Sequence, residues 1–169
     1  MTGRKYGAKV VFVPQTTYIS VVFAVALSLL VLVPAAGAST RRTAASNLLQ
    51  AVNRTRSAHG LRPLKLDTTL VRAARSHSVE MLRSNVFTHG DFHSRMVAFG
   101  VRGSQAGENL AWGNGPYAQA PAILAEWLAS PDHRANLLHQ GWTRIGIGLA
   151  RGTFLGNGGS TVVTADFAG

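Results

Sequence analysis

The segment that decides the fold is Thr143–Phe167, with the sequence TRIGIGLARGTFLGNGGSTVVTADF. Apolar residues alternate with small ones at its start, a glycine-rich stretch follows, and a β-branched run closes it. Alternation with a period of two is typical of a strand, and two such runs joined by a turn predict a β-hairpin. We therefore expect strands over residues 143–150 and 161–167, with a turn over residues 151–160.

The part of the chain before this hairpin carries helical patterns. Apolar side chains at helical spacing predict helices over residues 43–58 and 68–84, with Asp67 as the N-cap of the second. Pro121 suits the first turn of a third helix, and Ser130 is expected to cap a short helical turn after it. Helices followed by an antiparallel hairpin predict an α+β fold, with helices packed on a small antiparallel sheet.

The first 38 residues differ from the rest and predict an export signal. Three basic residues precede an apolar run that ends at Val33, and Ala36-Gly37-Ala38 follows soon after. This order is that of a secretory signal peptide, so cleavage is predicted after Ala38. An uncleaved membrane anchor is the alternative, because residues 10–33 are long enough to span a bilayer. In both cases the rest of the chain lies outside the cytoplasm.

The remaining residues are expected to form one domain over residues 45–169, after a short linker over residues 39–44. The chain has 17 basic and 7 acidic side chains, but its arginines are scattered and form no run with interleaved aromatic residues. A nucleic-acid partner is therefore not expected, whereas a basic exterior suits adhesion to an anionic cell envelope. The absence of cysteine excludes disulfides, thiolate metal sites and a cysteine nucleophile.

Polar, titratable side chains concentrate in three segments, around His89, Glu108 and His133. Glu108 precedes an apolar run, so it is expected to be partly buried and to need a cation or hydrogen-bond donors, with the histidines and Arg134 available. Two imidazoles and a carboxylate also make a zinc set, with water as the fourth ligand. By spacing alone, a metal or catalytic site and a satisfied structural cluster both remain open, and the structural cluster is favoured.

The other titratable and aromatic side chains are interpreted as structural. Asn109 is expected to fix a turn through a bond from its side chain to the backbone. Solvent exposure is expected at His93. Surface or boundary positions are expected for His59, His77 and His139. Core or cleft-wall positions are expected for Trp112, Trp127 and Trp142.

Six motifs occur in order along the chain. They are Asn53-x-x-Arg56, Gly60-Leu61-x-Pro63-Leu64, Phe87-Thr88-His89, Gly107-Glu108-Asn109-Leu110, Trp127-x-x-Ser130-Pro131-x-His133-Arg134-x-Asn136-Leu137-Leu138 and Ile145-Gly146-Ile147-Gly148. As an ordered set they resemble the CAP superfamily of cysteine-rich secretory, antigen five and pathogenesis-related proteins, also known for its SCP-like domain. The resemblance is to the bacterial branch and covers about residues 45–167.

This resemblance implies an α-β-α sandwich whose cleft holds two histidines and two acids that can bind a divalent metal such as zinc. By position, the first histidine, first acid and second histidine fall on His89, Glu108 and His133. The second acid falls on Ser130, so the tetrad is incomplete, and Asp132 and Glu126 are the candidates to replace it. The residues expected to line the cleft are Asn109, Ser130, Asp132, Arg134 and Trp127.

The function expected from these observations is that of a secreted or envelope-associated CAP domain. It would bind an envelope component, a lipid or a partner protein, and would touch a membrane only through the N-terminal segment if that segment is not cleaved. The alternative is a metal-assisted extracellular hydrolase that uses Glu108 with His89 and His133 and a metal-bound water as nucleophile. The missing second acid favours the binding module.

Overall fold

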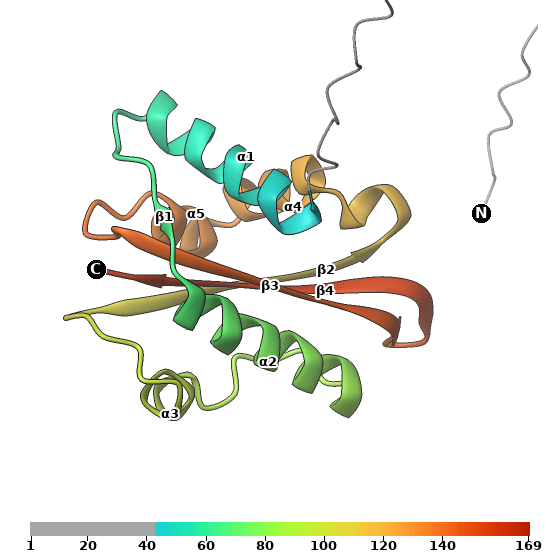
Figure 1. The fold of residues 1–169 in the computed structure, drawn as a ribbon. Coiled ribbons are helices and arrows are strands. Elements are labelled where there is room, and N and C mark those ends of the chain that lie inside the picture. Colours follow the sequence, from blue (N-terminus) through green and yellow to red (C-terminus); the bar gives the residue numbers. More distant parts are fainter. Residues whose placement is uncertain (1–42) are drawn as a thin grey trace, which may run out of the picture. The chain divides into compact units, whose positions relative to one another are not determined.

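The computed structural model describes residues 43–169, so the predicted signal peptide and most of the predicted linker lie outside the described residues. The described chain forms three layers, with a sheet between two layers of helices (Figure 1). One helical layer holds α1 (Ala44–Ala58), α4 (Ala120–Ala129) and α5 (Pro131–Leu137), and the other holds α2 (Thr68–Ser84) and α3 (Phe92–Ala98). This arrangement confirms the predicted α+β sandwich.

The sheet contains four strands in the order β1-β3-β4-β2. The predicted hairpin is formed by β3 (Arg144–Phe154) and β4 (Asn157–Ala168), which are antiparallel. It is longer than expected, because most of the glycine-rich stretch pairs as strand. At one edge β2 (Ala106–Asn114) runs antiparallel to β4, and at the other β1 (Lys65–Leu66) runs parallel to β3. The sequence patterns did not predict β2.

The predicted cap of α2 is confirmed, and that of α5 is wrong. Asp67 accepts hydrogen bonds from the backbone N–H groups of Thr69 and Leu70 at 2.8 and 3.1 Å. Ser130 precedes α5 but its side chain makes no capping bond. Pro131 at the first helical position lacks an N–H, so one fewer backbone donor needs a partner there.

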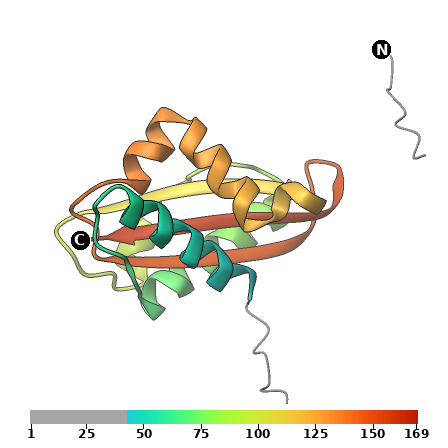
Figure 2. The same cartoon turned by 90° about the horizontal axis from the view of Figure 1, so that it is seen from above.

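Side chains of the sheet alternate between the two helical layers. Val163, Ala165 and Phe167 of β4 pack in the largest core cluster, together with residues of α1, α4 and α5 such as the fully buried Trp127. Figure 2 shows α1 and α4 side by side over this face of the sheet. Thr164, between these positions, faces the other layer, where Ser78 of α2 donates a hydrogen bond to its hydroxyl at 2.9 Å.

The motif Asn53-x-x-Arg56 fastens α1 to two neighbouring segments. Arg56 is fully buried, and its guanidinium donates hydrogen bonds to three backbone carbonyls, those of Arg62, Leu137 and His139, at 2.8–3.1 Å. Asn53 makes two reciprocal hydrogen bonds with the backbone of Leu64, at 2.8 and 3.0 Å. These bonds satisfy buried polar groups that the irregular connections leave unpaired.

The motif Ile145-Gly146-Ile147-Gly148 lets α2 lie directly on the sheet. A Cβ on Gly146 would come within 2.1 Å of the backbone carbonyl carbon of Leu70, and one on Gly148 within 2.2 Å of that of Ala74. The isoleucines that alternate with these glycines, Ile145 and Ile147, pack in the opposite layer. Within residues 43–169, no helix is long and apolar enough to cross a bilayer.

We predict that Gly148→Ala lowers the free energy of unfolding by about 1–3 kcal/mol, because the added methyl group pushes α2 off the sheet. Gly158→Ala is the matched control, because a Cβ there would meet nothing within 4 Å. Urea denaturation of both variants measures the difference. Equal midpoints would contradict the close helix–sheet contact.

Candidate functional site

Two carboxyl groups lie side by side within the layer of α2 and α3. Glu108 on β2 and Asp166 on β4 are directly opposite each other in the antiparallel register, so both side chains point to the same face. The Glu108 side chain is 3% exposed and Asp166 is fully buried. Buried carboxyl groups require donors or a proton, so the surrounding groups determine their state.

Side chains from three different elements surround Glu108, and two of them, His89 and Arg95, are within hydrogen-bond distance. His89, in the loop before α3, places its Nδ1 2.7 Å from Oε1 of Glu108. Arg95 of α3 forms a salt bridge to Oε2 through its Nη2. His77 of α2 has its Nε2 3.9 Å from the same oxygen. The carboxylate thereby ties the loop and α3 to the edge of the sheet, next to His77 of α2.

The partners of Glu108 are themselves held in place. Arg95 donates through Nη1 to the backbone carbonyl of His89 at 3.2 Å, and its guanidinium lies 5.4 Å from the ring centre of Phe92. His77 has its Nε2 2.8 Å from the carbonyl oxygen of Thr88 and is only 2% exposed. The predicted surface or boundary position of His77 was therefore wrong, whereas His59, His93 and His139 are exposed as expected.

Burial is the main cause that raises the pKa of Asp166 to about 8; the negative charge of Glu108 and a hydrogen bond with that carboxyl also raise it, and the positive charge of Arg95 opposes them. Asp166 is therefore neutral at pH 7, and the two carboxyl groups share its proton. Apart from Glu108, neither oxygen of Asp166 has a hydrogen-bond partner among residues 43–169. An acid in this pairing keeps a proton that an isolated aspartate would lose.

Asn109, the residue after Glu108, serves the opposite layer. It is fully buried, its Nδ2 donates to the backbone carbonyl of His133 at 3.0 Å, and its Oδ1 accepts from Nδ2 of Asn136 at 2.9 Å. Trp142 donates through Nε1 to the carbonyl of Asn136 at 2.8 Å. Asn109 thus has a structural role, but it joins β2 to α5 and does not fix a turn.

The predicted ligands separate into a pair and a single residue. His89 and Glu108 are in contact, whereas His133 belongs to α5 in the other layer, and its buried Nδ1 has no hydrogen-bond partner in the described part of the chain. Nowhere in residues 43–169 do three His, Cys, Asp or Glu side chains form a group suited to a metal ion. The residues present therefore do not fit the implied three-ligand set, and the metal site stays a prediction.

The residues predicted to line the cleft occupy varied positions. Asp132 and Arg134 are exposed, as is Glu126, and Ser130 is half-buried. Trp127 is fully buried, where its Nε1 donates to the carbonyl of Leu110 at 2.8 Å, so it belongs to the core. The arginine that pairs with Glu108 is Arg95, and the prediction of Arg134 as a donor was wrong.

Three residues of this polar cluster were not predicted, namely His77, Arg95 and Asp166. A signal was present for Asp166, because it is an acid inside the apolar strand pattern Val162–Phe167. Arg95 and His77 carried no comparable signal, because each lies on a helix face that only the packing of α2 and α3 turns toward Glu108.

Comparison with known sequences supports the family. Residues 49–167 match the sequence model of the CAP family, described as the cysteine-rich secretory protein family. The Bacillus subtilis (strain 168) protein YkwD is 34% identical over 106 residues, which are 60% of this chain and 40% of YkwD. The membrane protein YlbC of the same organism is 34% identical over 114 residues, 64% of this chain and 32% of YlbC. The chain belongs to the CAP family, and its match spans less than half the length of these two relatives.

Solved structures show the same fold. An extracellular protein containing an SCP domain from Bacillus anthracis str. Ames is 29% identical, with a TM-score of 0.62 over 72% of this chain and 38% of that one. An outer surface protein from Borrelia burgdorferi is 22% identical, with a TM-score of 0.57 over 72% of this chain and 90% of that one. The first of these relatives is extracellular by its description, which is the setting that the N-terminal segment predicts for this chain.

We predict that the stability of the protein falls as the pH rises from about 4 to about 8, in part through Asp166. In this window the folded state retains the proton of Asp166, whose pKa is raised to about 8, while the unfolded chain releases it near a pKa of about 3.9. Asp166→Asn removes this titration, and its amide still donates to Glu108. Urea midpoints measured from pH 5 to 9 should therefore decline less steeply for Asp166→Asn, and parallel slopes would contradict the shared proton.

A thermal melt with and without zinc tests the implied metal set. Because Arg95 and His89 already occupy the oxygens of Glu108, we expect zinc to leave the melting temperature of the wild type unchanged. Saturation at a hundred times the dissociation constant would add about 2.7 kcal/mol if the folded state alone bound the metal. A rise that disappears in both His89→Ala and His133→Ala would establish the metal set instead.

Proposed function

We propose that this protein is an exported CAP-domain binding module that engages an anionic component of the cell envelope. Two observations support export, namely the predicted signal or anchor in the first 38 residues and the extracellular description of the Bacillus anthracis relative. The choice of an anionic partner rests on the charge of the described domain.

The observation that carries this proposal is an excess of basic charge in the described domain. Five of the 17 Lys and Arg side chains, and none of the seven acidic ones, precede residue 43, so the described part has a formal charge of +5. The ion pairs of Glu108 with Arg95 and of Asp67 with Arg144, the latter at 2.6 Å, cancel internally and leave this excess unchanged, whereas the proton on Asp166 increases it by one. A positive field of this kind attracts anionic partners.

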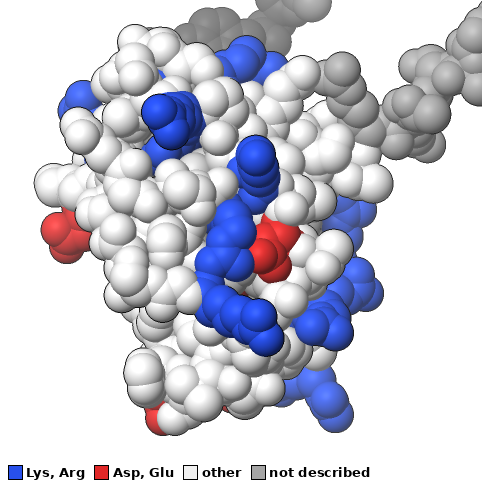
Figure 3. Space-filling view, turned by 60° about the vertical axis from the view of Figure 1, so that its left-hand side comes forward, with Lys and Arg blue, Asp and Glu red and all other residues white. Residues whose placement is uncertain are grey.

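The surface also carries more basic than acidic side chains. Figure 3 shows Lys and Arg side chains gathered around a small acidic patch on one face of the described domain. Exposed basic groups at this density attract anionic polymers over a Debye length of about 8 Å at physiological salt. The attraction should therefore weaken as salt is added.

The hydrolase alternative receives less support from the polar cluster. A metal-assisted reaction needs a carboxylate that is free to bind the metal or to accept a proton from water. Glu108 is 3% exposed and both of its oxygens have cationic or imidazole partners. Its arrangement suits a structural anchor that keeps α3 and its preceding loop on the sheet.

We predict that the protein, purified after export by a bacterial host, sediments with isolated cell envelopes at about 50 mM salt and is released at about 500 mM, where screening shortens the Debye length. The supernatant should contain no soluble envelope fragments. Failure to sediment at low salt would refute the binding proposal. Fragments released by the wild type, but not by a folded Glu108→Gln variant, would favour the hydrolase.

A further inference from the structure

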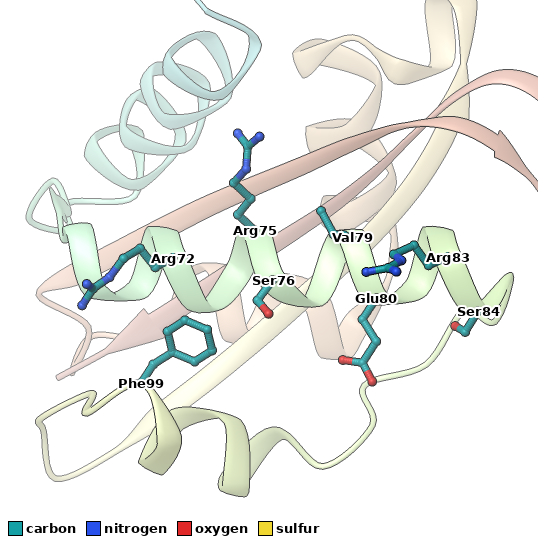
Figure 4. Close-up of a pocket in the computed structure, with 8 residues that line it drawn as sticks. All are labelled: Arg72, Arg75, Ser76, Val79, Glu80, Arg83, Ser84 and Phe99. Atoms are coloured by element: carbon teal, nitrogen blue, oxygen red, sulfur yellow. The ribbon is translucent and has the colours of Figure 1, made fainter.

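A groove of about 850 Å³ lies along the outer face of α2, on the side of the helix away from the sheet. Its lining includes Arg72, Arg75 and Arg83, with Val79 and Glu80 on the same helix and Phe99 at the end of α3. Figure 4 shows Arg72 and Arg83 toward opposite ends of the groove and the ring of Phe99 facing α2. None of these residues takes part in the contacts of Glu108.

The seating of α2 on the sheet explains why these side chains face solvent. The helix buries Leu70, Ala74 and Met81 against β3 and β4, at spacings of one face of a helix. Positions 72, 79 and 83 share the opposite face, also at helical spacing. Because the inner face of α2 packs closely on the sheet, the helix cannot rotate about its axis. The arginines on its outer face therefore stay exposed to solvent.

The three arginines are not neutralised within the protein. In the part of the chain that the structure describes, the side chains of Arg72, Arg75 and Arg83 make no ion pair or hydrogen bond. Arg72 and Arg75 are three residues apart, a spacing at which like charges repel on a helix surface. Glu80 is the one acid in the lining, and among the described residues the basic side chain within 4 Å of its carboxylate is the buried imidazole of His77, whose Nδ1 lies 3.6 Å from Oε2. The groove therefore has a net positive charge, which an anionic ligand would neutralise.

The shape and length of the groove indicate what kind of anion fits. Arg72 and Arg83 are eleven residues apart, about 16 Å along the helix axis, which exceeds the size of a single phosphate. Guanidinium groups bind phosphate oxygens in a bidentate manner, so spaced arginines suit spaced phosphates. Val79 and Phe99 offer apolar contact for the carbon units between the phosphates. A recess of this form accommodates a linear chain better than the flat surface of a bilayer.

The basic lining continues beyond the groove. Arg75 extends from α2 away from Phe99 in Figure 4, and it also lines a neighbouring hollow that contains Arg151 of β3. The hollow includes Val71 of α2 and Leu149 of β3, so the second basic region joins the first across α2. A polymer that leaves the groove would therefore meet further positive charge.

We infer that the α2 groove binds a linear phosphodiester polymer, with Arg72, Arg75 and Arg83 contacting its phosphates. This inference rests on the proposed function and names the chemistry and the place of the binding. It assigns the ligand to the outer face of α2 and leaves the cluster around Glu108 with its structural role.

The test titrates the exported protein with poly(glycerol phosphate) at about 50 mM salt and compares two double variants. Arg72→Gln/Arg83→Gln removes two groove charges. Arg54→Gln/Arg134→Gln removes two exposed arginines from α1 and α5 and changes the net charge equally. We expect the groove variant to lose about tenfold or more in affinity, with a salt slope smaller by about one to two, and the control to lose less than about threefold. Circular dichroism confirms that both variants fold.

The remaining outcomes separate this inference from the proposed function. Equal losses in the two variants would overturn the groove, while envelope binding by the wild type would leave the proposed function standing. Binding to envelopes without binding to the polymer, or tighter binding to phosphatidylglycerol vesicles than to the polymer, would overturn the polymer as ligand. Absence of binding to both envelopes and polymer would overturn the two proposals together.

Discussion

The direct contact between the backbone of α2 and the backbone of β3 sets the position of the polar groups on both faces of α2. Gly146 and Gly148 provide it, because a Cβ at either position would lie within 2.2 Å of a helix backbone atom. Because no side chain separates them, the helix and the sheet can pack closely in only one relative position. The inner face of α2 then presents His77 to Glu108 and Ser78 to Thr164. The outer face presents the arginines of the groove.

The edge strand β2 connects the layer of α2 and α3 to the layer of α1, α4 and α5. Its neighbouring residues Glu108 and Asn109 point to opposite faces, so Glu108 holds the loop and α3 while Asn109 holds α5. The motif Gly107-Glu108-Asn109 therefore acts as a two-sided anchor. Gly107 itself allows this packing, since a Cβ there would lie 2.6 Å from the side chain of Asn136. In this arrangement the polar cluster stabilises the fold and the outer surface is left to recognition.

Parts of the structure could be predicted because their causes are local. The cap at Asp67, the end of α1 near His59-Gly60 and the hairpin of β3 and β4 depend on residues that are neighbours in sequence. The contact of His89 with Glu108 was expected only as part of a larger set. Strand β2 was not predicted, because its polar start at Gly107-Glu108-Asn109 hides the alternation that continues through Leu110 and Trp112.

The sequence by itself determined the class of fold, the ordered motifs of the family, the absence of thiol chemistry and the basic balance of charge. Tertiary structure alone decided which charges meet. Asp166 became a proton-sharing partner of Glu108 because two distant strands are in register, and Arg95 replaced Arg134 as the donor because α3 and α5 lie on opposite faces of the sheet. Local propensities act over a few residues, whereas the desolvation and pairing of buried charges depend on which layer each side chain enters.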